Sequence, residues 1–139
     1  MAFPVVPAAF LGAVLGLSGL GQAWRVAATW WGLPAVLGEG ILAVAALVWA
    51  SLLGLYLLRA LRDRAGVLAE MQHPVQGGTP ALAAVSTLLI VLAVLPYSRA
   101  AAWVLAGLGL AWNLAYALWH TGQLWQGGRQ PQDTVPTLY

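Results

Sequence analysis

The stretch Gly40–Leu58, GILAVAALVWASLLGLYLL, decides the fold of this chain, because it runs for 19 residues without a charged side chain. Glu39 precedes it and Arg59 follows it, so charges bracket an apolar segment. A helix of ~20 residues crosses the hydrocarbon core of a bilayer, whereas a membrane-spanning strand needs only about 9–11 residues. The stretch is too long for a strand and lacks alternation of polar and apolar residues, so it predicts a transmembrane helix.

Three further segments are apolar over comparable lengths, and short connections link the four segments in pairs. Pro34 and Pro96 mark these connections, because proline interrupts a helix. The residues between the second and third segments are hydrophilic, and the tail 125–139 is a polar linker. The chain is therefore expected to be one all-α integral membrane domain of about four transmembrane helices in two hairpins. The expected spans are residues 4–24, 40–58, 77–96 and 100–120 of a single domain, 1–139.

The composition agrees with a lipid environment. Apolar residues make up 61% of the 139 residues and charged residues only 7%, against about 25% in ordinary globular domains. The net charge of +2 is too small to indicate nucleic-acid binding. The absence of cysteine excludes disulfides, thiolate metal sites and cysteine nucleophiles. No phosphate-binding loop or catalytic triad is recognisable, so we expect neither an enzyme nor a bound cofactor or metal.

The distribution of arginine predicts the orientation in the membrane, because cytoplasmic loops carry an excess of basic residues. Four arginines fall on the side shared by both chain ends, and two fall on the other side. The first group is Arg59, Arg62, Arg64 and Arg129, and the second is Arg25 and Arg99. We therefore expect a multi-pass protein of the cell inner (plasma) membrane with its N-terminus in the cytoplasm.

Small residues follow one face of the first predicted helix. Gly12, Gly16 and Gly19 fall within a narrow arc at about 100° per residue, so this face carries no side chains. Such a face can pack closely against another helix, where Gly12 and Gly16 form a small-xxx-small pair. It can also line a pore, in which the missing side chains leave room for a solute. The spacing by itself is more typical of packing, and both interpretations stay open.

Polar side chains occur at two places inside the predicted spans. Ser86 and Thr87 lie in the third span, where hydroxyls commonly bond back to their own helix or, alternatively, offer donors to a passing anion. Asn113, Tyr116 and His120 share one face of the fourth span. Such a stripe does not suit lipid, and we expect a hydrogen-bonded seam between helices.

Two histidines, His73 and His120, fall on the same side of the membrane in this topology. Two imidazoles at one depth can hold a haem between helices. His73 precedes Pro74 in the hydrophilic loop, which favours a solvated side chain over an axial ligand. An alternative function stays open: a self-contained four-helix membrane anchor subunit that binds a partner protein or haem.

Several short motifs resemble, in their order and spacing, the tellurite-resistance/dicarboxylate transporter family, which belongs to the slow anion channel superfamily. The motifs extend along the whole chain. They are Pro7–Gly12, Leu15–Leu17, Ala23–Arg25, Gly38–Gly40, Val67–Glu70, His73–Val75, Ser86–Leu89, Leu124–Gly128 and Pro136–Tyr139.

The resemblance implies a fold and a function. Members of the family have ten helices in five hairpins, with the odd-numbered helices around a central pore, and assemble as homotrimers. The chain would form the front part of such a bundle, with the glycine face on the first pore helix and Ser86 and Thr87 on the third. The transported solutes would be small anions, dicarboxylates or tellurite, crossing a bacterial inner membrane.

The chain departs from the family pattern in two places. Family members often have a proline shortly before the hydroxyl pair, where this chain has Ala84. The chain also stops at Tyr139, where a fifth helix would be expected to begin. The resemblance therefore implies an N-terminal fragment of a larger anion channel or transporter.

Overall fold

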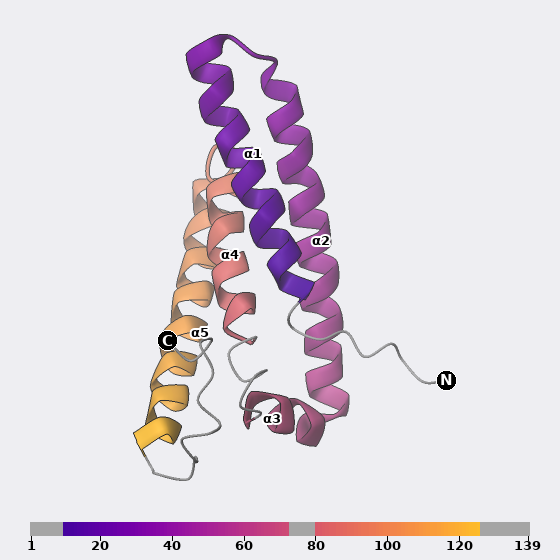
Figure 1. The fold of residues 1–139 in the computed structure, drawn as a ribbon, viewed down its shortest axis with the longest axis vertical. Coiled ribbons are helices and arrows are strands. Elements are labelled where there is room, and N and C mark those ends of the chain that lie inside the picture. Colours follow the sequence, from indigo (N-terminus) through magenta and orange to yellow (C-terminus); the bar gives the residue numbers. More distant parts are fainter. Residues whose placement is uncertain (1–9, 73–79, 126–139) are drawn as a thin grey trace, which may run out of the picture.

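The computed structural model describes residues 10–72 and 80–125, and most of these are helical (Figure 1). This part of the chain forms α1 (Leu11–Trp31), α2 (Ala35–Arg62), α3 (Arg64–Gln72), α4 (Ala81–Val94) and α5 (Arg99–Trp125). Several features expected from the sequence lie outside the described residues: the beginnings of the first and third spans, His73, Arg129 and most of the C-terminal linker.

α1 and α2 form the first hairpin. α1 continues past residue 24, where the first span was expected to end, and includes Arg25, whose charge is paired inside the bundle. The helix ends at Gly32, whose φ of 67° lies in the left-handed region that commonly closes a helix. Pro34 then precedes α2, and its carbonyl accepts a hydrogen bond from Trp24 Nε1 at 3.0 Å.

The hydrophilic segment after α2 contains the short helix α3, which lies across the lower end of the bundle in Figure 1. Asp63 caps this helix, because its carboxylate accepts a hydrogen bond from the Gly66 N–H at 2.9 Å. Glu70 is buried and pairs with Arg59 at 2.6 Å, which ties α3 to the end of α2. The Asp63 cap and the Arg59–Glu70 ion pair therefore hold this polar segment in place.

α4 and α5 form the second hairpin, joined by a turn that contains Pro96. Ser98 caps α5, because its Oγ accepts a hydrogen bond from the Ala101 N–H at 3.2 Å. α4 has only 14 residues, about 21 Å at 1.5 Å per residue. Among the described helices, two segments are long and apolar enough to cross a membrane, Ala35–Arg62 and Arg99–Gly122.

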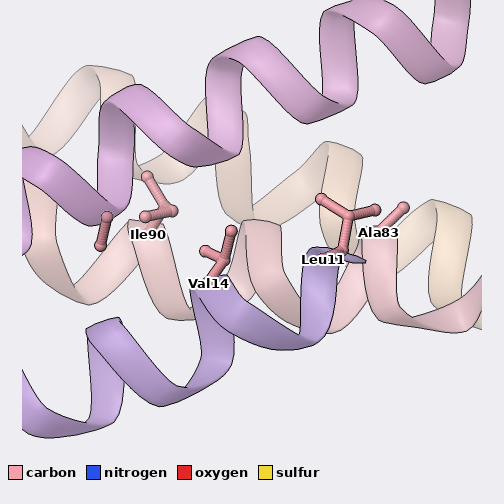
Figure 2. Packing of buried hydrophobic residues seen from close by; sticks show 5 residues of the cluster. Leu11, Val14, Ala83 and Ile90 are labelled. Carbon is pink, nitrogen blue, oxygen red and sulfur yellow. The ribbon is translucent and has the colours of Figure 1, made fainter. Parts of the chain in front are cut away.

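The buried apolar core lies where α1, α2 and α4 meet (Figure 2). Leu11 and Val14 of α1 pack there against Ala45 of α2 and against Ala83 and Ile90 of α4. α5 packs mainly on α4, and its outward side chains, such as Leu118, are exposed. An outer surface of exposed leucine and tryptophan suits a bundle whose solvent is lipid.

Two glycines set the distance between α1 and α2. A Cβ atom added at Gly38 would lie 2.9 Å from Trp24 Cδ1 and 3.3 Å from the carbonyl oxygen of Gly21. A Cβ atom at Gly21 would lie 2.6 Å from Leu42 Cγ. A methyl group has no room at either position. Glycine therefore allows the backbones of α1 and α2 to approach closely here.

We predict that Gly38→Ala destabilises the first hairpin by about 1–3 kcal/mol, because the added methyl group pushes the two helices apart. Gly40→Ala is the matched control on the same helix, since its Cβ atom would meet nothing within 4 Å. That variant should be neutral or slightly stabilising, because alanine favours helix more than glycine does. Unfolding of both variants in detergent provides the measurement, and equal stability of the two would contradict this packing assignment.

Candidate functional site

The glycine face of α1, formed by Gly12, Gly16 and Gly19, is open in the described part of the molecule. A Cβ atom added at any of the three glycines would meet no heavy atom within 4 Å. Gly16 and Gly19 are exposed, and Gly12 is half-buried. The three glycines therefore do not mediate the packing of α1 against the other described helices.

The packed side of α1 lies opposite to this face. Gly21 follows Gly12 by nine positions, which is about half a turn away around a helix at 100° per residue. Gly21 touches α2, and Ser18, one turn earlier, is fully buried. α1 thus carries two kinds of glycine, one that packs closely against α2 and one on an open face.

The hydroxyl pair of α4 is inside the packed bundle. Ser86 and Thr87 are both buried, and both hydroxyls donate to the carbonyl of Ala83, at 3.1 and 2.7 Å. Thr87 Oγ1 also accepts a hydrogen bond from Trp49 Nε1 of α2 at 3.0 Å. The structure therefore gives these hydroxyls the local backbone bonds common in membrane helices, with Thr87 turned toward α2.

Arg25 joins three helices at the end of the bundle where both hairpins turn. Its Nε and one terminal nitrogen donate to the two carboxylate oxygens of Glu39, both at 2.7 Å. Its terminal nitrogens also donate to the carbonyls of Leu92 and Ala93, at 3.0 and 3.3 Å. Pro96, four residues after Leu92, has no N–H to bond that carbonyl, so Arg25 supplies the missing donor.

Tyr97, in the turn between α4 and α5, completes this cluster. Its hydroxyl donates a hydrogen bond to Glu39, and that bond raises the pKa of the Tyr97 hydroxyl above its usual value. The hydrogen bond thus favours the protonated form, which is the form that donates to Glu39. The cluster of Arg25, Glu39 and Tyr97 fixes the axial position of α1 and its glycine face relative to α4.

The polar stripe of α5 lies away from the glycine face. Tyr116 is buried and stacks on His120, with ring centroids 5.7 Å apart, while Asn113 is half-buried. His73, the second histidine of the haem alternative, lies outside the described residues. Within residues 10–72 and 80–125, no three His, Cys, Asp or Glu side chains come together as metal ligands.

Sequence reasoning interpreted Arg25 as an orientation signal and Glu39 as a charge that precedes a span, and it did not pair the two residues. Their opposite signs on either side of the Trp30–Pro34 turn were a usable signal, because a hairpin brings such positions together. The carbonyls of Leu92 and Ala93 gave no signal, since every residue has a carbonyl and only the packing of α4 beside α1 selects these two.

The comparisons with known proteins agree with this architecture. Residues 5–139 match a family model described as voltage-dependent anion channel. A search of curated proteins found no match.

We predict that Arg25→Gln lowers the free energy of unfolding by about 1–2 kcal/mol, because the charge-assisted hydrogen bonds to the partly exposed Glu39 carboxylate and to two carbonyls are lost. Arg99→Gln, an exposed arginine near the same end, should change it by less than about 0.5 kcal/mol. The double variant Arg25→Gln/Glu39→Gln should cost clearly less than the sum of the two single variants. Strict additivity in thermal unfolding would show that the pair is not coupled.

Proposed function

The chain belongs to the voltage-dependent anion channel family, and we propose that it supplies the first two hairpins of a helix-lined anion pathway. That family consists of helical membrane channels, which confirms the all-α integral membrane class expected from the sequence. The proposal extends to a bacterial inner membrane and to small anions, dicarboxylates or tellurite as solutes. We further propose that α1 and α4 are the first and third helices of the ten-helix bundle.

The open glycine face of α1 is the observation that carries the proposal. Close packing would explain the glycines if another described helix lay against them, and none does. Because glycine has no side chain, Gly12, Gly16 and Gly19 leave space in which a solute can pass. An anion passing this wall would meet backbone and small apolar surface and no fixed negative charge.

The other candidate residues take supporting roles in this proposal. The guanidinium of Arg25 is occupied by Glu39 and by the carbonyls of α4, so it positions α1 and does not carry the anion. Ser86 and Thr87 shape the helix beside the wall through their bonds to Ala83. Asn113, Tyr116 and His120 form a seam in the outer layer of helices.

We predict that both chain ends lie in the cytoplasm and that the protein assembles as a homotrimer. The arginine bias supports the orientation: Arg59, Arg62 and Arg64 lie at the α2–α3 end, while Arg25 and Arg99 lie at the end where both hairpins turn. An alkaline phosphatase fused after Tyr139 should be inactive, because the enzyme requires the periplasm to fold. An active fusion would contradict the proposed orientation.

We predict that Gly12→Ala is tolerated and that Gly12→Asp blocks anion flux. The alanine methyl group meets nothing within 4 Å, so abundance and assembly should be unchanged, with flux reduced less than about twofold. The aspartate places a negative charge beside the pathway, where its field repels an anion, and flux should fall by an order of magnitude or more. Flux into proteoliposomes and trimer content, measured on the complete protein, provide the test.

The packing and the pore interpretations of the glycine face differ most in the effect they predict for Gly12→Ala. In a packing interface even one methyl group separates two backbones, so Gly12→Ala would disrupt assembly nearly as much as Gly12→Asp. That result would show that the glycine face is a packing interface and does not line the pathway.

A further inference from the structure

The short helix α3 is attached to the bundle separately from the main core. Val67 of α3 and Tyr56 of α2 form a small buried cluster, against which Ala60 and Met71 pack. No residue of α3 belongs to the larger core where α1, α2 and α4 meet. α3 packs chiefly on α2 and lies across the lower end of the bundle (Figure 1). Its position therefore depends on a small set of local contacts, which is typical of segments that open while the rest of a protein stays folded.

A buried carboxylate joins α3 to α2. Glu70 Oε2 accepts a hydrogen bond from Arg59 Nη1 at 2.6 Å, and the Glu70 side chain is only 6% exposed. Removal of one partner from such a pair is costly while the other charge stays buried, because that charge is then left uncompensated. The cost disappears when α3 moves away from α2 and Glu70 enters water. The pair therefore favours the packed position of α3, and loss of Arg59 would favour its release.

One polar group of the same cluster opposes the packed position. Tyr56 is 3% exposed, and its hydroxyl has no hydrogen-bond partner among the described residues. A buried hydroxyl without a partner is unfavourable compared with one that is bonded to water. Because Val67 packs on Tyr56, movement of α3 away from α2 would let water reach this side chain. The packed position thus combines a favourable ion pair with an unsatisfied hydroxyl.

The connection between the two helices is suited to such a movement. Asp63 is the single residue between the end of α2 at Arg62 and the start of α3 at Arg64, and its φ of −131° and ψ of 70° are not helical. Residues at the ends of elements commonly absorb the change of angle in a hinge motion. The Asp63 carboxylate accepts its hydrogen bond from Gly66 within the same short segment. This cap of α3 can therefore persist when the contacts with α2 are broken.

We propose that α3 is a strap that opens at Asp63 and closes over the end of α2 while the long helices stay folded. The Arg59–Glu70 ion pair and the contact between Tyr56 and Val67 hold the closed form, and the unsatisfied Tyr56 hydroxyl raises its free energy. Opening uncovers apolar surface of α2 and hydrates the two charges and the hydroxyl. The strap gives this end of the bundle two states, and it does not depend on the proposed pathway along α1.

Cysteine labelling of the full chain in lipid nanodiscs tests the strap, because the natural chain has no cysteine. Val67→Cys places a thiol in the buried cluster, where a water-soluble maleimide can react only after α3 opens. Leu68→Cys, at an exposed position of the same helix, reports the rate of an accessible thiol. The Val67→Cys thiol should react about tenfold or more slowly than the Leu68→Cys thiol.

Arg59→Gln leaves the Glu70 carboxylate buried without its partner, so it should raise the labelling rate of Val67→Cys by about tenfold or more. Arg64→Gln is the matched control, since Arg64 is an exposed arginine of α3, and it should change the rate less than about twofold. The exchanged pair R59E/E70R should return the rate toward that of the natural pair. Ala45→Cys, in the main core, should keep its slow labelling in the Arg59→Gln protein, which separates opening of α3 from loosening of the whole bundle.

Tyr56→Phe gives a result that a purely stabilising role of Tyr56 would not produce. Phenylalanine keeps the ring that packs on Val67 and removes the buried hydroxyl, so the labelling rate of Val67→Cys should fall by about threefold to tenfold.

Three results would overturn the proposal. The first is equally fast labelling of Val67→Cys and Leu68→Cys, which would show that no closed form exists. The second is an unchanged rate in the Arg59→Gln protein, and the third is a higher rate in the Tyr56→Phe protein.

Discussion

One guanidinium bonds both helices of the first hairpin to the end of the second. Arg25 of α1 donates to both carboxylate oxygens of Glu39 on α2 and to two carbonyls at the end of α4. A carbonyl at a helix end lacks an intrahelical donor and needs another partner. Pro96 removes the donor that would otherwise serve the Leu92 carbonyl, and Arg25 supplies a donor in its place. The planar, forked guanidinium suits this task, because it can bond a carboxylate with two parallel hydrogen bonds and still reach the carbonyls.

The same residue type, glycine, serves two purposes on α1. Gly21 lies against α2, where even a methyl group would collide with Leu42, whereas Gly12, Gly16 and Gly19 have open space beside them. The difference arises from position around the helix, since the two sets point in opposite directions. One membrane helix can therefore use glycine both for close packing against a neighbour and for an open face without side chains.

The bundle also presents two very different surfaces to its surroundings. The glycine face of α1 lacks side chains and charge, which suits the wall of a solute pathway. A groove between α2 and α5 is lined mainly by apolar side chains, among them Trp49, Leu53 and Trp112. α4 forms the floor of that groove and also packs against α1.

The sequence by itself determined that the chain is helical and membrane-embedded, since a charge-free stretch as long as Gly40–Leu58 leaves no other way to bond its backbone in lipid. It also placed the three glycines on one face and showed where proline interrupts the helices, because these properties depend on local geometry. It did not distinguish Gly21 from Gly12, reveal that Arg25 bonds the end of α4, or show that Ser86 and Thr87 are buried. Those outcomes depend on which helix lies beside which and at what height, and this is decided by contacts between residues far apart in the chain, such as Arg25 and Leu92.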